Sequence, residues 1–391
     1  MDCLSLWDIE DILKSNSQEG GIPLDITHDN HYVPQWYQQY FLDGKNKFYY
    51  CDLSPSRIDL PDGSHRYHNN LSQKGKANCF VQKDLYTMYF GNIDSDIIER
   101  KFFDSREKLG YKAWPIFLSE GWGRGYPESW RSVLEFMDSQ WFRTPKGMAF
   151  VKEVIQANKM PFTTNTILNT MMKIHRFHCT IWAECIWEIV SAENSSVKFL
   201  LTDHPITLYH PLYLPKMFPH DPHPWQIGTQ VVYPLTLDKC LILTHLQNVR
   251  QPENLKLLRP RENGRAYSMT IKNVAEVIRN RQLTEDNVIH LNYLLKSRAW
   301  RYIAEIEKNW LYPEKQWKGM WQDIRVVLLP DKNKNVLAMA GGDVFVGFED
   351  GSSIALDEFG RPLPVDASSE ISKMKNHVDK LIKNKFAKSQ H

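Results

Sequence analysis

The chain has 391 residues, of which 42% are hydrophobic and 24% charged, and its formal net charge is +2. This length can bury a large core, and the near balance of charge excludes a strongly basic surface that covers the whole protein. The six cysteines include no C-x-x-C pair, so we expect free thiols in a reducing compartment. The N-terminus has acids without a basic region, and no apolar run approaches about 18 residues. These features predict a cytoplasmic protein with no signal peptide and no membrane partner.

The first clear pattern, at residues 31–41, predicts an extended segment that leads directly into a short helix. Pro34 disfavours helix in the residue before it and suits the first turn of the helix that follows. We therefore expect His31 on the extended entry and Gln35 near the start of a short helix with an aromatic face. Strand patterns follow at 48–53, 78–81 and 85–90.

Helical periodicity dominates the next part of the chain. Four segments carry apolar residues at helical spacing, most regularly 127–143, where they recur at i, i+3, i+4 and i+7. Thr144 can cap the third of these helices, and Thr163 or Thr164 the fourth. The predicted helices cover about 95–118, 127–143, 145–155 and 164–177.

The pattern then changes to period two, which predicts a sheet, and a helical pair follows it. Thr284 can cap the second helix of that pair. The predicted strands are 185–190, 197–203, 231–233 and 240–244. Together these elements predict an α+β fold: a helical bundle packed on a mostly antiparallel sheet, with a small C-terminal β module and a terminal helix.

The composition divides the chain into three predicted parts. Residues 1–27 form an N-terminal extension, 28–312 the main α+β domain, and 313–391 an appended module. In the module, short strand patterns such as 324–329 precede a Lys-rich amphipathic helix capped near Ser368. That basic helix could bind nucleic acid or dock on a protein.

Two acids stand out in the predicted sheet. If the turn at 193–196 makes a hairpin, Glu188 and Asp203 become diagonal neighbours on one apolar face. A buried carboxylate must be paired, protonated or bound to a metal, so this spacing suits a divalent ion such as Mg²⁺ or Mn²⁺. The alternative is that Asp203 caps its own turn and Glu188 forms a salt bridge. A register slip of one residue would separate the two acids.

Two further positions, Arg143 and Asn292, are candidates for the same cleft. Arg143 ends an apolar helix, where it either stabilises the helix C-terminus or clamps an anion in a cleft shared with His31. Asn292 lies beside an apolar helix stripe and either ties that helix to a strand or serves the site. Glu99 and Glu107 are about two turns apart, which favours a solvated helix face.

Histidines gather in two places. His175, His178 and Cys179 share one helix face at a spacing that zinc can use, but no second ligand pair exists at motif spacing, which favours core packing. Four more lie in a Pro-rich loop and are interpreted as loop residues, with metal binding as the alternative; they are His204, His210, His220 and His223.

The order of these motifs resembles a large, mostly microbial family known only as a domain of unknown function. The most specific matches are His31-Tyr-Val-Pro-Gln35-Trp-Tyr37, which fits H-x-V-P-Q-x-Y, and Thr202-Asp203-His204-Pro205, which fits [ST]-D-x-P. Looser matches are Gln140-x-x-Arg143-Thr-Pro145, Ile186-Trp187-Glu188, Tyr233-Pro-Leu235 and Asn292 before Ala299-x-Arg301-Tyr302. The family usually has Leu where Gln38 stands here. The resemblance covers about 28–305 and implies a shared fold without an established activity.

Two functions fit this sequence. In the first, His31, Gln35, Arg143 and Asn292 form the cleft of a nuclease-like hydrolase of phosphodiesters, and Glu188 and Asp203 hold its Mg²⁺ or Mn²⁺. The Lys-rich C-terminal helix would then hold nucleic acid. In the second, the same side chains only stabilise the scaffold of a binding or regulatory protein, whose C-terminal module binds a partner. The number of polar residues at element ends favours the enzyme.

Overall fold

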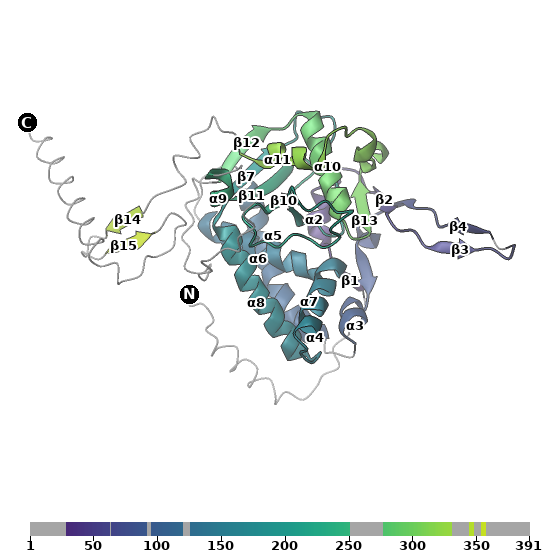
Figure 1. The fold of residues 1–391 in the computed structure, drawn as a ribbon, viewed down its shortest axis with the longest axis horizontal. Helices are drawn as coiled ribbons and strands as arrows, with labels where there is room; N and C mark the ends of the chain where they lie inside the picture. The colour runs from purple at the N-terminus through teal and green to yellow at the C-terminus, as the bar shows by residue number, and fades with distance from the viewer. Residues whose placement is uncertain are drawn as a thin grey trace, which may run out of the picture.

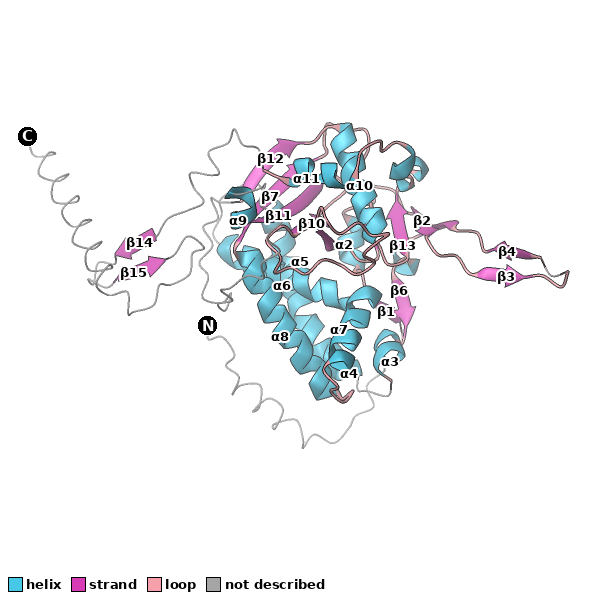
Figure 2. Cartoon of the chain, in the orientation of Figure 1, coloured by secondary structure: helices cyan, strands magenta, loops and turns pink. Residues whose placement is uncertain are grey.

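The computed structural model describes residues 29–62, 64–91, 95–119, 126–250 and 277–330, together with two short strands at 344–347 and 353–356. Helices and mostly antiparallel sheets form one α+β body, which confirms the predicted fold class (Figures 1 and 2). In the view of Figure 1, helices α4, α7 and α8 lie in the lower part of the body, and α10 and α11 lie in its upper part beside strands β12 and β7. The basic helix predicted after Ser368 and the extension 1–27 lie outside the described residues.

The helical layer follows the predicted periodicity closely. Thr144 and Thr163 are the N-caps of α7 and α8, and each hydroxyl accepts a backbone N–H three residues on. A π-helical segment, η2, continues α4 into α5. The bounds are α4 Ser95–Ile98, η2 Glu99–Asp104, α5 Ser105–Leu118, α6 Tyr126–Arg143, α7 Pro145–Ala157 and α8 Thr164–Ala183.

Two sheets carry the remaining core. The first has the order β12-β7-β11-β10-β9, antiparallel except for the β12–β7 pair. Its strands are β7 Cys185–Ser191, β9 Thr207–Tyr209, β10 Gln230–Pro234, β11 Lys239–His245 and β12 Ile278–Gln282. The second is antiparallel with the order β5-β2-β13-β8. Its strands are β2 Phe48–Asp52, β5 Leu71–Lys74, β8 Leu201–Thr202 and β13 Tyr302–Glu305.

The predicted hairpin between 185–190 and 197–203 is wrong. β7 pairs with β11 on one side and β12 on the other, whereas β8 pairs with β13 in the second sheet. Every residue of β7 is buried, as expected for a central strand with both edges occupied. The short connection at 193–196 therefore leads from one sheet to the other instead of turning back within one sheet.

Two shorter predictions also differ from the structure. The segment 85–90 forms helix α3 (Leu85–Phe90) instead of a strand, and 324–329 forms helix α11 (Ile324–Leu328). Of the predicted helical pair, the second helix is α10 (Glu285–Arg298), capped by Thr284 as predicted. Before it, the structure describes helix α9 (Leu246–Arg250) and strand β12, and residues 251–276 between them lie outside the described residues. Short apolar runs fit either structure, so their packing partners decide between them.

The packing does not break at residue 312. Leu311, Trp321, Ile324 and Leu328 are buried in one apolar cluster with α10 and with strands of both sheets. The main body therefore extends to about residue 328. Beyond it, β14 (Val344–Gly347) and β15 (Ser353–Leu356) pair as an antiparallel hairpin, as the strand patterns predict. None of the described helices has the length and apolar character needed to cross a membrane.

Candidate functional site

His31 and Gln35 lie together at the start of the main body. His31 ends β1 (Asp29–His31) and Gln35 begins α2 (Gln35–Gln39), with Pro34 as the cap between them. The side-chain nitrogen of Gln35 lies 3.1 Å from Nε2 of His31. Both side chains are half-buried, so this pair is the part of the predicted cleft that the structure assembles.

Arg143, the last residue of α6, lies between two carboxylates. Its two terminal nitrogens donate to Glu99 and to Glu107. The π-helical turn between the two acids absorbs an extra residue, which brings both side chains to one side of the helix. Burial acts to lower the pKa of Arg143, but the two carboxylates outweigh it and raise the pKa. The structure contradicts the expected anion clamp, because both arms of the guanidinium are occupied.

The same ion-pair cluster joins four helices. Glu107 accepts from the indole nitrogen of Trp36 in α2 at 3.2 Å, and Glu99 accepts from the hydroxyl of Tyr86 in α3. The cluster defined by Tyr86, Glu99, Glu107 and Arg143 thus connects α2 and α3 to the bundle. The sequence predicts Glu99 and Glu107 on a solvated helix face. In the structure both instead pair with the guanidinium of Arg143, which is largely buried.

Both oxygens of the Glu188 carboxylate are held by an arginine. Two guanidinium nitrogens of Arg281 in β12 donate to its two oxygens, each at 2.8 Å. Glu188 is 2% exposed, and such a carboxylate needs a paired charge inside the sheet. The structure therefore contains a salt bridge at Glu188, which the sequence suggests as the alternative to a metal site.

Asp203 follows β8 and binds backbone. Its carboxylate accepts N–H groups from Trp300, Arg301 and Tyr302 at 2.8, 2.6 and 2.7 Å. Burial raises the pKa of Asp203 to about 6, against these three hydrogen bonds, which lower it. Asp203 and Glu188 belong to different sheets, so the predicted Mg²⁺ or Mn²⁺ site between them is wrong. The cause is the misassigned hairpin.

Asn292 has a scaffold role. Its side-chain oxygen accepts the N–H of Leu200 at 3.1 Å, and its side-chain nitrogen donates to the carbonyl of Lys198 at 2.6 Å. Asn292 is fully buried on α10, so the amide ties that helix to the segment before β8. Of the two roles that the sequence suggests for Asn292, the structure therefore contains the first, in which the side chain ties its helix to a neighbouring segment.

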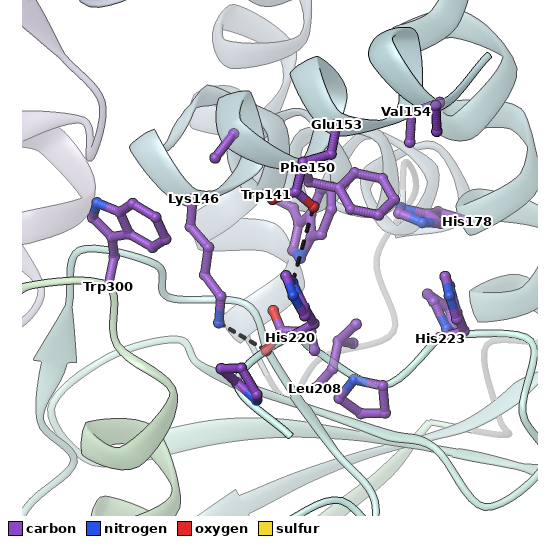
Figure 3. Close-up of a pocket in the computed structure, with 16 residues that line it drawn as sticks. Trp141, Lys146, Phe150, Glu153, Val154, His178, Leu208, His220, His223 and Trp300 are labelled. Carbon is purple, nitrogen blue, oxygen red and sulfur yellow. Dashed lines mark hydrogen bonds and ion pairs between the residues drawn. The ribbon is translucent and has the colours of Figure 1, made fainter. Parts of the chain in front are cut away.

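A cavity of about 300 Å³ lies between α7 and the loop 219–224 (Figure 3). Lys146 and Glu153 come from one face of α7, His178 from α8, and Trp300 from the segment after α10. Ligand sites for small molecules begin at about this volume. We call this space the α7 pocket.

The segment 202–205, which carries the [ST]-D-x-P motif, contacts two residues that belong to the walls of the α7 pocket or begin them. Asp203 holds the backbone of Trp300, and Nδ1 of His204 lies 2.6 Å from the hydroxyl of Thr144, the cap of α7. Asp203 and His204 are fully buried and do not line the pocket. The motif residues therefore position two walls of the pocket.

An ion pair crosses the pocket beside these walls. Nζ of Lys146 donates to Asp221 at 2.7 Å and to the carbonyl of Arg298 at 2.8 Å. An ammonium has three donors, and the contacts with described residues use two of them, which leaves the third for a ligand. The guanidinium of Arg298 donates to three carbonyls and so fixes the loop; these belong to Tyr213, Phe218 and His220.

Three imidazoles reach the α7 pocket: His178, His220 and His223 (Figure 3). The ring of His223 stacks on Trp225, with the ring centres 4.1 Å apart and 7° between the planes. Burial, and to a smaller extent His178, lowers the pKa of His223, which favours the neutral form of the ring. His220 is exposed, and its Nδ1 lies 3.9 Å from Glu153.

Behind His178 lies a buried group that sequence reasoning interpreted as core packing. Asp138 of α6 places one oxygen 2.6 Å from Nδ1 of His175 and the other 2.7 Å from Nδ1 of His178. Sγ of Cys179 is 3.7 Å from Nδ1 of His175. In the described part of the chain, Asp138, His175 and Cys179 form the group whose donor atoms lie close enough to hold a metal ion.

The sequence did contain a signal for Asp138. It stands four residues after Leu134 and three before Trp141, within the apolar stripe of α6. An acid on a buried stripe needs a partner, and the histidines of α8 are that partner. The pairing was missed because nothing local shows that α6 and α8 pack against each other.

Stability should fall in mild acid because of His204. Burial, together with Lys146, lowers the pKa of His204 to about 3. An unfolded histidine takes up a proton near pH 6.5, so the stabilising effect is present above that pH and is lost as pH falls. We expect the free energy of unfolding to drop by about 1.4 kcal/mol per pH unit below 6.5. Urea unfolding at pH 7, 6 and 5 gives the free energy of unfolding at each pH. This free energy should fall less steeply with decreasing pH in His204→Gln than in the wild type. An equal fall in both proteins would contradict the lowered pKa of His204.

Comparison with models of known families, with curated proteins and with solved structures finds no match for this chain. The family resemblance that the motifs suggest stays a prediction.

Proposed function

We propose that the protein is a hydrolase of phosphodiesters whose reaction takes place in the α7 pocket. The observation that carries this proposal is the position of His223, which lines a ligand-sized cavity while its ring is fixed against Trp225. The predicted activity is thus retained, but its residues are different from those that the sequence suggested. The pair His31 and Gln35 lines no wall of this pocket.

The chemistry follows from the groups around the cavity. A neutral imidazole can accept a proton from a water molecule as that water attacks phosphorus, which typically contributes a factor of about 10²–10⁴. The remaining N–H donor of Lys146 can bind a phosphate oxygen, and the flat face of Trp300 offers a stacking surface for a base. Asp221 holds Lys146 in place rather than contacting the substrate.

The proposal is tested with the full-length protein, bis(4-nitrophenyl) phosphate and a single-stranded RNA. We expect His223→Gln to lower the hydrolysis rate by about 100-fold or more. His68→Gln, at an exposed position directly after strand β4 (His65–Tyr67), serves as the matched control and should keep the wild-type rate. Parallel assays in EDTA, Mg²⁺ and Mn²⁺ test the divalent ion expected from the sequence. A wild-type rate in His223→Gln would contradict the proposal, and no turnover by the wild type would favour the binding or regulatory function.

A further inference from the structure

Asp138, His175 and Cys179 bring three different donor types to one point in the core. Asp138 comes from α6, while His175 and Cys179 lie one turn apart on α8 and therefore share a face. All three are almost fully buried, at 0%, 1% and 0% exposure. Their nearest donor atoms all lie within 4.8 Å of one another.

We infer that Asp138, His175 and Cys179 hold a zinc ion. This goes beyond the proposed hydrolase, because none of the three lines the α7 pocket. A tetrahedral zinc with bonds of about 2.0–2.3 Å places neighbouring donors roughly 3.4–3.6 Å apart. The distance of 3.7 Å between Cys179 Sγ and His175 Nδ1 is close to this value. The 2.6 Å between His175 Nδ1 and Asp138 would need to open by less than 1 Å.

The donor set and its charge favour zinc over the ions expected from the sequence. Mg²⁺ and Mn²⁺ prefer carboxylate, carbonyl and water oxygens, whereas zinc accepts thiolate and imidazole. One carboxylate and one thiolate balance the two charges of the ion, so the complex of Asp138, His175 and Cys179 is neutral. Neutrality matters because a net charge in the core would carry a large desolvation penalty.

The surrounding residues already orient one ligand. The second oxygen of Asp138 lies 2.7 Å from Nδ1 of His178, whose ring packs between Phe142 and Trp182. Such a contact fixes the direction of a metal-bound carboxylate. His178 also lines the α7 pocket, so a single carboxylate separates the inferred ion from a pocket wall.

The test measures the metal directly in the full-length protein. We expect about one zinc per chain by mass spectrometry, and X-ray absorption should show a sulfur scatterer at about 2.3 Å. After exchange with Co²⁺, a thiolate-to-cobalt absorption band should appear in the near ultraviolet. These readouts need no substrate, so they stand or fall independently of the hydrolase.

Cys179→Ser should lower the zinc content by about tenfold or more and remove the cobalt band. Cys240→Ser, at another buried thiol, in β11, is the matched control and should keep both. The absorption spectrum of the wild type decides the question even if Cys179→Ser does not fold. Wild-type protein without zinc, zinc without a sulfur scatterer, or full zinc content in a folded Cys179→Ser would each overturn the inference.

Discussion

Replacing Asp203 by alanine is expected to lower the free energy of unfolding by about 3 kcal/mol, because three backbone N–H groups lose their common acceptor. Those groups belong to Trp300, Arg301 and Tyr302. Their loss also frees the backbone that carries Trp300, one wall of the α7 pocket. We therefore expect a stability defect together with weaker ligand binding. Urea unfolding at pH 7 measures the first effect, and titration with a nucleotide analogue measures the second.

Asp59→Ala is the matched control for that experiment. Asp59 lies on β3 (Arg57–Asp59) and pairs with Arg57 in an exposed position, so its removal should cost less than about 0.5 kcal/mol. A loss at Asp203 no larger than the loss at Asp59 would mean that the carboxylate does not hold this backbone.

Removal of Arg143 should have an effect of similar size. Arg143→Ala leaves Glu99 and Glu107 facing each other without the cation between them. Breaking a buried pair in this way costs about 3–5 kcal/mol, and we expect the lower end because both carboxylates keep some solvent contact. Thermal and urea unfolding measure the loss directly.

The charge argument at Arg143 can be separated from packing. Adding Glu99→Gln and Glu107→Gln to Arg143→Ala removes the like-charge repulsion and should recover part of the stability. If the triple variant is less stable than Arg143→Ala alone, the two carboxylates are held by other groups and the ion-pair account of this cluster fails.

Helices could be predicted because their signals are local. The caps Thr144, Thr163 and Thr284 each start the helix expected from them, and the apolar stripes between them are buried. Helix periodicity and capping depend on residues only a few positions apart, so one sequence contains them in full.

Strand partners could not be predicted in the same way. The runs of β7 and β8 look like a hairpin because a short turn joins them, yet β7 takes β11 and β12 and β8 takes β13. Pairing depends on residues far apart in the chain, and an apolar strand fits more than one neighbour. Glu188 and Asp203 were joined in one site by this error alone.

The α7 pocket illustrates the same limit. The wall with the imidazoles comes from α8 and from a Pro-rich loop, and the opposite wall comes from α7. Each segment is recognisable, but Lys146 and Asp221, which join α7 to the loop, are 75 residues apart. Asp203 stands out in the sequence as an acid at the end of an apolar strand, and in the structure its carboxylate holds the backbone of Trp300.

The central claim is that phosphate binds in the α7 pocket, and a crystal soaked in tungstate, a phosphate mimic with strong anomalous scattering, tests it most directly. We predict an anomalous peak within hydrogen-bonding distance of His223 and of Nζ of Lys146. A peak beside His31 and Gln35 instead, or no peak in the α7 pocket at saturating tungstate, would contradict the account.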